Sequence, residues 1–313
     1  MPFKFPRIDY AAHPYYQIAD GDELHEAHAA PGLRERVVER AQNILASEQR
    51  LALARTGPGG QADEFSRDGF ATFALGKDRL AKLKVAAAPY VSALQQQRNA
   101  APLGQLDFRT TVLPVDEGRT SEIYELIEDS CRDLGLVELA SAHVGLPMRI
   151  RFVHLQMDRA EDQYIQQKGR LDGALSPAFY LHIDAKTMWL KIMVYLQDTD
   201  EENGALRYIV GSHDSDMTPY ERAVRRANDA LLLDNTDPKT RAAFARLPPE
   251  LQHKCNFGND LFGEEAERVL QAERLVEAPG GTAILFDISG AHRGAILHKG
   301  ERQVLQITLE PAI

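Results

Sequence analysis

LKIMVYLQDTDEENGALRYIVGSH, residues 190–213, is the stretch that decides the fold predicted for this chain. Its apolar first third predicts a buried strand, and the acidic stretch that closes on Asn203-Gly204 predicts a tight turn. The apolar residues after the turn predict a second, short strand, which ends at Gly211-Ser212-His213. The segment therefore predicts β structure in which two consecutive strands are joined by a short connection.

A second stretch of similar character, GGTAILFDISGAHRGAILHKGERQVLQITLEP, spans residues 280–311. It predicts a strand, a loop that carries His292, and a final strand that begins near Arg302. The final strand alternates between two faces, as a strand packed in apolar surroundings does. One face carries Arg302, Val304, Gln306 and Thr308, and the other carries Gln303, Leu305, Ile307 and Leu309.

The β core is expected to begin at Met148, where the hydrophobic period changes toward two. In this strand we expect one face to carry Ile150, Phe152, His154 and Gln156, and the other to carry Arg149, Arg151, Val153 and Leu155. Upstream, three segments have apolar residues at helical spacing, and such helices would pack against one outer face of a sheet. They are Leu33–Arg55, Lys77–Asn99 and Ser121–Leu134.

A candidate metal site begins with His182-Ile183-Asp184, just before the first apolar run. In a strand, side chains two residues apart point to the same face, so this imidazole and carboxylate can bind one ion. With His292, two histidines and a carboxylate would occupy one face of the metal and leave the other positions open, as a non-haem Fe(II) oxygenase requires. The structural alternative is a hydrogen-bonded His182–Asp184 pair at a strand end.

Arg302 is a candidate anchor for an acidic cosubstrate. A guanidinium inside a β core is costly unless it is paired, and its fork geometry suits a carboxylate. The alternative is an exposed arginine at a strand edge. For the third metal ligand, His298 competes with His292, but His298 lies next to Lys299 in a polar turn, whereas His292 follows a predicted strand.

These motifs resemble the phytanoyl-CoA dioxygenase family of Fe(II)- and 2-oxoglutarate-dependent oxygenases. The resemblance rests on HxD at residues 182–184, NGxLxxxxGSH at residues 203–213, and a distal histidine with an arginine ten positions later. Asp68-Gly69-Phe70 adds the DGF strand found near the start of that family, so the matching motifs span residues 65–311. His292 has the family's spacing to Arg302.

The resemblance implies a mainly β fold with flanking helices (α+β), with a double-stranded β-helix core of the jelly-roll or cupin type. We expect a single oxygenase domain over residues 1–313, with an N-terminal helical region and DGF strand in residues 1–147 and the core in residues 148–313. The core would include a helical insertion at about 213–279, which could cover the site as a lid or be a solvated decoration.

The resemblance also implies an activity. Fe(II) would be bound by His182, Asp184 and His292, and Arg302 would hold the far carboxylate of 2-oxoglutarate. With O2, oxidative decarboxylation would yield succinate and CO2 together with a hydroxylated small molecule. The retained Asp184 argues against halogenation, because halogenating members replace this carboxylate with a small residue. Desaturation, ring closure and epoxidation use the same ligands and stay open.

Two further residues are candidates for cofactor binding. Lys191 interrupts the run LKIMVYL on a face shared with Met193 and Tyr195, so it is either a snorkelling side chain or a second cation near the acidic cosubstrate. Gln156, on the strand before HxD, could contact the cosubstrate or product, or make a structural hydrogen bond. His213 is expected to have a structural role at the end of its strand.

Composition excludes several classes of protein. The chain has 313 residues and a formal net charge of −10, which disfavours binding to nucleic acid. It has no apolar run of 18 residues, and MPFKFPRIDYAAHP lacks the hydrophobic core of a signal peptide, so we expect a cytoplasmic protein without a membrane span. Cys131 and Cys255 are expected to be free thiols. The expected partner is a small-molecule substrate, and the insertion offers a surface for a homodimer.

Two functions of other classes remain open. The first is a non-catalytic, cupin-like protein in which the same three residues hold Zn or nothing. The second is a redox-neutral isomerase or hydrolase that uses the metal as a Lewis acid without O2. Neither alternative requires an arginine at a fixed distance after the distal histidine.

Overall fold

The computed structural model describes residues 33–54, 63–100, 110–113, 121–160, 183–184, 188–213, 270–295 and 297–312. Residues 214–269, which make up most of the expected insertion and include Cys255, lie outside this part, and so does His182. The helices are α3 Leu33–Ala54, α4 Asp63–Asp68, α5 Lys77–Ala100, α7 Glu122–Asp133 and α8 Leu136–Val144. Three of them, α3, α5 and α7, confirm the predicted helices to within one residue at each end.

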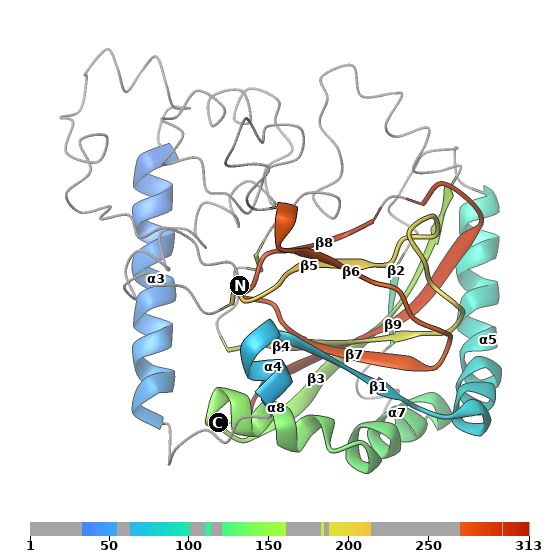
Figure 1. Cartoon of the computed structure of the whole chain (residues 1–313), viewed down its shortest axis with the longest axis horizontal. Helices are drawn as coiled ribbons and strands as arrows, with labels where there is room; N and C mark the ends of the chain where they lie inside the picture. The colour runs from blue at the N-terminus through green and yellow to red at the C-terminus, as the bar shows by residue number, and fades with distance from the viewer. Residues whose placement is uncertain are drawn as a thin grey trace.

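The strands form two antiparallel sheets (Figure 1). The larger sheet has the order β1-β7-β4-β9-β3-β2, and the smaller has the order β6-β5-β8. The strands are β1 Phe70–Ala74, β2 Thr110–Leu113, β3 Met148–Arg159, β4 Leu190–Tyr195, β5 Leu206–Ile209, β6 Glu273–Val276, β7 Thr282–Asp287, β8 His292–Gly294 and β9 Glu301–Pro311. This arrangement confirms the predicted mainly β fold of the jelly-roll type with flanking helices, and the described strands do not close a barrel.

Two apolar layers position the sheets. The outer layer lies between the six-stranded sheet and helices α5, α7 and α8, as Figure 1 shows, and it contains the predicted apolar face of β9, which includes Leu305, Ile307 and Leu309. The inner layer lies between the two sheets and includes Tyr195, Tyr208 and Phe286. The opposite face of β9 contributes Val304 to the inner layer, so this face points between the sheets. Arg302 lies at one end of it.

The face pattern predicted for β3 is wrong at its first residues. The pairing of β3 with β9 shifts register between Ile150 and Phe152, which indicates a β-bulge. One extra residue reverses the alternation, so Ile150 packs with Val153 and Leu155 in the outer layer instead of sharing a face with His154. Beyond the bulge, His154 and Gln156 keep the shared face that was predicted.

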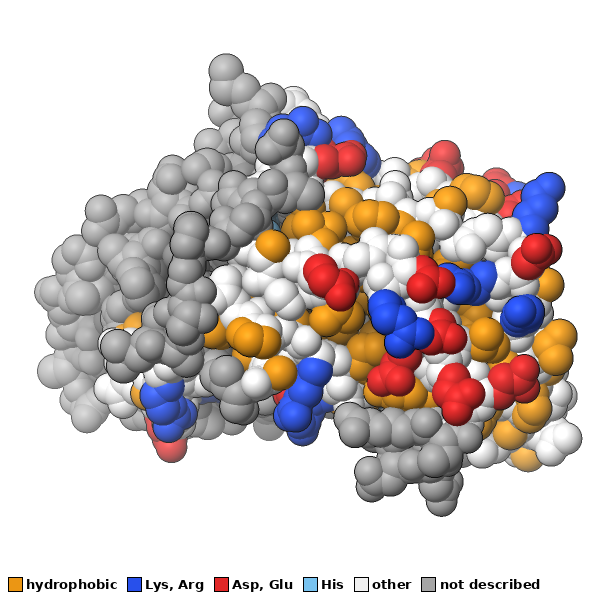
Figure 2. Space-filling view, turned by 90° about the horizontal axis from the view of Figure 1, so that it is seen from below, with side chains coloured by type: hydrophobic (Ala, Val, Ile, Leu, Met, Phe, Trp, Pro, Cys, Tyr) orange, Lys and Arg blue, Asp and Glu red, His pale blue; other side chains and the backbone are white. Residues whose placement is uncertain are grey.

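The surface over the helices beneath the six-stranded sheet carries acidic and basic side chains interspersed with hydrophobic ones (Figure 2). Among the described residues, no helix combines the length and hydropathy needed to cross a membrane.

Cys131 is buried and free, and burial raises the pKa of its thiol to about 12, as expected of an inert thiol.

The outer layer should dominate stability. Leu305 is fully buried in the centre of the six-stranded sheet, so Leu305→Ala should lower the free energy of unfolding by about 3 kcal/mol through lost burial and the cavity that remains. The matched control is Val85→Ala on α5, where the side chain is 71% exposed, and it should change stability by less than about 0.5 kcal/mol. Urea denaturation of both variants measures the difference, and equal effects would contradict the assignment of this layer as the core.

Candidate active site

The turn from Asp287 to Gly290 brings two of the predicted ligand segments together. The backbone N–H of Asp184 donates to the carbonyl oxygen of Ile288 at 3.0 Å. The same turn leads directly into β8, whose first residue is His292. This hydrogen bond therefore ties Asp184 to the turn that leads into His292, although the two residues are about a hundred positions apart in the sequence.

The His292 ring is oriented by a hydrogen bond to the turn. Its side chain is buried, and Nδ1 lies 2.9 Å from the carbonyl oxygen of Gly290. A carbonyl can only accept, so Nδ1 carries the proton, and in the neutral ring Nε2 has the lone pair. Histidines that bind metals are commonly oriented in this way. The ring also stacks on Tyr208, with centroids 6.4 Å apart, and meets the edge of Phe286 at 5.3 Å.

Tyr208 ties the turn to the smaller sheet. Its hydroxyl donates to the carbonyl oxygen of Asp287 at 2.8 Å. A Cβ at Gly290 would overlap this hydroxyl, so the close approach requires glycine at that position. Ser212 of the GSH motif adds a second tie, because its Oγ accepts the N–H of Ala291 at 2.7 Å.

The DGF and GSH motifs contact each other beside this turn. The N–H of Gly211 donates to the carbonyl oxygen of Asp68 at 3.1 Å. The His213 Nε2 lies 2.9 Å from the carbonyl oxygen of Ser66 in α4. His213 thus has the structural role that was predicted for it, and both motifs position the segment that carries His292.

Lys191 pairs with a predicted metal ligand. Its Nζ lies 2.6 Å from Oδ2 of Asp184, and the two side chains are 25% and 20% exposed. Lys191 is opposite Thr308 on β9, six residues from Arg302 and hence about 20 Å along the strand. The structure therefore places Lys191 beside Asp184 at the ligand end of the interior, and its role as a second cation near the acidic cosubstrate stays a prediction.

Arg302 lies at the other end of the interior. It is 4% exposed, which excludes the alternative of an exposed strand-edge arginine. Its Nη2 donates to Oδ2 of Asp158 at 2.6 Å, and its Nη1 donates to the carbonyl oxygen of Gly204. The buried guanidinium is paired, as we expected from the sequence. Its charged partner within the described residues is Asp158, a carboxylate of the protein and not of a cosubstrate.

Gln156 makes a structural hydrogen bond, one of the two roles considered for it. Its Nε2 donates to Oδ2 of Asp158 at 2.6 Å, and its Oε1 accepts from Gln306. Sequence analysis missed Asp158 and did not single out His154, although both follow from the alternation of β3 that places Gln156 on the interior face. Burial lowers the pKa of His154, and the charge of Lys191 lowers it further, so its imidazole is neutral near pH 7.

The described residues fit a resident Fe(II) in two respects. His292 offers Nε2 of a buried, oriented ring, and Asp184 offers a carboxylate fixed by its backbone to the same turn. Within the described part of the chain, no three His, Cys, Asp or Glu side chains form a metal cluster. His182, the remaining predicted ligand, lies outside that part, so the three-ligand site stays a prediction.

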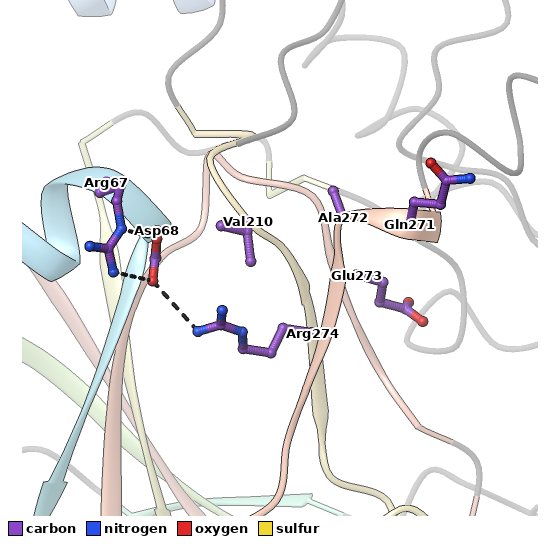
Figure 3. Close-up of a pocket in the computed structure, with 7 residues that line it drawn as sticks. All are labelled: Arg67, Asp68, Val210, Gln271, Ala272, Glu273 and Arg274. Atoms are coloured by element: carbon purple, nitrogen blue, oxygen red, sulfur yellow. Dashed lines mark hydrogen bonds and ion pairs between the residues drawn. The ribbon is translucent and has the colours of Figure 1, made fainter. Parts of the chain in front are cut away.

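A cavity of about 340 Å³ opens between the end of α4 and the start of β6 (Figure 3). The buried carboxylate of Asp68 receives Nε of Arg67 at 2.7 Å and lies 3.6 Å from Nη1 of Arg274. The hydrogen bond from Arg67 is the main cause that lowers the pKa of Asp68. None of the predicted ligands lines this cavity.

Residues 176–296 match the family model described as Phytanoyl-CoA dioxygenase (PhyH). The match covers His182, Asp184 and His292 and ends before Arg302. It confirms the resemblance that the motifs indicated, and the predicted Fe(II), 2-oxoglutarate and O2 are the cofactors of this family. No curated protein matches the chain.

Several solved structures are similar to the chain. AviO1 from Streptomyces viridochromogenes Tue57 is 18% identical, with a TM-score of 0.44, over 82% of this chain and 98% of that one. EctD from S. alaskensis with bound Fe is 17% identical, with a TM-score of 0.47, over 82% and 78%. HygX from Streptomyces hygroscopicus with nickel and 2-oxoglutarate bound is 16% identical, with a TM-score of 0.46, over 82% and 89%.

The Asp287 side chain anchors the turn from its other side. Its Oδ2 lies 2.9 Å from Nε2 of His143 in α8, and its Oδ1 accepts the N–H of Ser289 at 2.8 Å. Burial alone would raise the pKa of Asp287. The hydrogen bond and charge of His143, with the charge of His213 and the bond from Ser289, outweigh burial and hold the pKa well below its usual range.

Asp287→Asn should therefore lower stability in a pH-dependent way. A depressed folded pKa contributes stability above the unfolded value of about 3.9, and this contribution is lost as pH falls through the folded pKa. We expect a loss of about 2 kcal/mol at pH 5 that shrinks as the pH falls below about 4. Urea denaturation across this range measures it. Asp133→Asn, at a partly exposed ion pair with Arg79, should change little at any pH, and an Asp287 effect that grows toward low pH would contradict the assignment.

Proposed function

We propose that this protein is an Fe(II)- and 2-oxoglutarate-dependent dioxygenase that hydroxylates a small organic molecule and releases succinate and CO2. The observation that carries the proposal is the shared turn, which joins the backbone of Asp184 to Ile288 and orients the ring of His292 through Gly290. Both segments thus contact the same turn, which supports a metal site that they share. The family match over residues 176–296 supports the same reaction class.

Each described residue has a defined task in this proposal. Asp184 and His292 bind the metal together with His182, and the Gly290 carbonyl fixes the histidine tautomer that can do so. Arg302 holds the far carboxylate of the cosubstrate. The apolar layer around Tyr208 and Phe286 keeps water from the space between the sheets. When bound, Fe(II) would activate O2, which is the oxidant, and 2-oxoglutarate would supply two electrons through its decarboxylation to succinate and CO2.

One observation favours the non-catalytic, cupin-like alternative. Asp184 and Arg302, which would bind the metal and the cosubstrate, already have charged partners of the protein itself, Lys191 and Asp158. A protein in which these pairs are permanent would bind neither iron nor 2-oxoglutarate tightly. Binding measurements on the metal and on the cosubstrate therefore decide between the two functions.

The metal ligands are tested by Fe(II) binding under anaerobic conditions. His292→Ala should weaken Fe(II) binding by more than about 100-fold, because a ligand atom is lost outright. His298→Ala is the matched control, since His298 is the competing candidate only six residues away, and it should bind Fe(II) within about twofold of the wild type. Isothermal titration calorimetry gives both constants. Loss of binding in the His298 variant with retention in the His292 variant would reverse the assignment of the third ligand.

The reaction class is tested by adding 2-oxoglutarate to the anaerobic Fe(II)-loaded protein and recording the visible metal-to-ligand charge-transfer band. The wild type should show the band. Asp184→Ala should lose it together with the metal. Arg302→Ala and Arg302→Gln should keep the metal but need at least about tenfold more 2-oxoglutarate, because they lose the anchor and also leave the Asp158 carboxylate without its Arg302 partner, so that it repels the cosubstrate.

Arg132→Ala, at an exposed ion pair with Asp129 in α7, serves as the control for removal of an arginine. Succinate that forms only in the presence of O2 would then establish the oxygenase reaction. A protein that binds iron without forming the band would instead be the cupin-like protein or a redox-neutral Lewis-acid enzyme.

A further inference from the structure

The interior face of β3 places a carboxylate directly opposite the predicted cosubstrate anchor. Asp158 and Arg302 are partners in the antiparallel pairing of β3 with β9. Their side chains are 1% and 5% exposed, and Nη2 of Arg302 lies 2.6 Å from Oδ2 of Asp158. The guanidinium that would hold the far carboxylate of 2-oxoglutarate therefore already holds a carboxylate of the protein.

This pair is fixed by a connected hydrogen-bond network. Gln156 donates to the same oxygen of Asp158 at 2.6 Å, and Gln306 donates to the side-chain oxygen of Gln156. On the opposite side, Nη1 of Arg302 donates to the carbonyl oxygen of Gly204. Both terminal nitrogens of the guanidinium are thus engaged, and Oδ2 of Asp158 accepts from both Arg302 and Gln156.

Among the described residues, the charge of Arg302 at this end of the interior is balanced by Asp158. A second carboxylate at Arg302 would share one cation with Asp158, and two carboxylates repel each other strongly where little water is present. The guanidinium nevertheless keeps a donor for a ligand at Nε, which is buried and has no hydrogen-bond partner among the described residues. A diacid can therefore bind here, but only in competition with Asp158.

We propose that Asp158 is a specificity-determining residue that sets the affinity for the cosubstrate. It competes with the far carboxylate of 2-oxoglutarate for Arg302, and so it reduces the preference for a 2-oxo acid with a second carboxylate over one without. This inference rests on the proposed function and adds to it a residue that limits cosubstrate binding. With Asp158 in place, half-saturation of the site would require a higher concentration of 2-oxoglutarate than with a neutral residue at position 158.

The first test is Asp158→Asn, which keeps the size of the side chain and an oxygen that can accept from Arg302 but removes the charge. The full chain, loaded with Fe(II) under anaerobic conditions, is titrated with 2-oxoglutarate, and the charge-transfer band gives the dissociation constant. We expect the variant to bind about tenfold more tightly than the wild type. Unchanged or weaker binding overturns the inference, and weaker binding would mean that Asp158 orients Arg302 for the cosubstrate.

Glu301→Gln is the matched control. Glu301 neighbours Arg302 on β9 and is also paired across the strands, with Arg159 at 3.1 Å, but both side chains are about one quarter exposed. Glu301→Gln changes the net charge by the same amount as Asp158→Asn but leaves the Asp158–Arg302 pair in place. The dissociation constant of 2-oxoglutarate should therefore stay within about twofold of the wild-type value. An equal gain in both variants would show a general effect of charge and would overturn the specific role of Asp158.

A second measurement uses the wild type alone and does not depend on folding of a variant. The dissociation constant of 2-oxoglutarate is compared with that of 2-oxopentanoate, which has the same chain length and no second carboxylate. We expect a preference for the diacid of less than about tenfold, since Arg302 is already neutralised. A larger preference overturns the inference. Failure of both acids to bind the Fe(II)-loaded protein removes the proposed function and the inference together, whereas a large preference removes the inference alone.

Discussion

The candidate site depends on the main-chain groups of one turn, residues 287–290. The carbonyl oxygen of Ile288 accepts the backbone N–H of Asp184, and that of Gly290 accepts from the ring of His292. The turn is held in place by the Tyr208 hydroxyl on one side and by the Asp287 carboxylate with His143 on the other. Because main-chain atoms carry the ligand segments, the relative position of these segments is fixed by the fold of the sheets and not by the rotamers of long side chains.

A second constraint is neutrality between the sheets. The interior is lined mainly by apolar side chains, so each charge placed there needs a partner nearby. Each end of the interior has its own ion pair: Lys191 pairs with Asp184 at one end, and Arg302 pairs with Asp158 at the other. A divalent cation and a dianionic cosubstrate would add no net charge to this interior, but each would have to share a residue that is already paired. Binding of the metal or the cosubstrate would therefore require that Asp184 or Arg302 exchange part of its present ion pair for the ligand.

Much of the fold could be predicted because local patterns agree with the tertiary structure. The alternation of β9 separates Arg302 from Leu305 as expected, and the helices around the sheet follow their apolar spacing. The site was predicted less completely. The partner of Arg302 comes from a strand whose pairing register cannot be read from a single segment, and the partner of Lys191 comes from a residue outside the strands, so neither Asp158 nor the Asp184–Lys191 pair was foreseen. His182 lies outside the described residues, and the full ligand set remains a prediction.

The bulge in β3 has a consequence for comparisons between sequences. The extra residue between Ile150 and Phe152 reverses which side chains point between the sheets, and everything after it, including Gln156 and Asp158, depends on that reversal. An alignment with a relative that lacks the bulge needs a one-residue gap at this point. Without the gap, the interior positions of one protein would be matched to outward-facing positions of the other, and the residue opposite the arginine would be compared with the wrong neighbour.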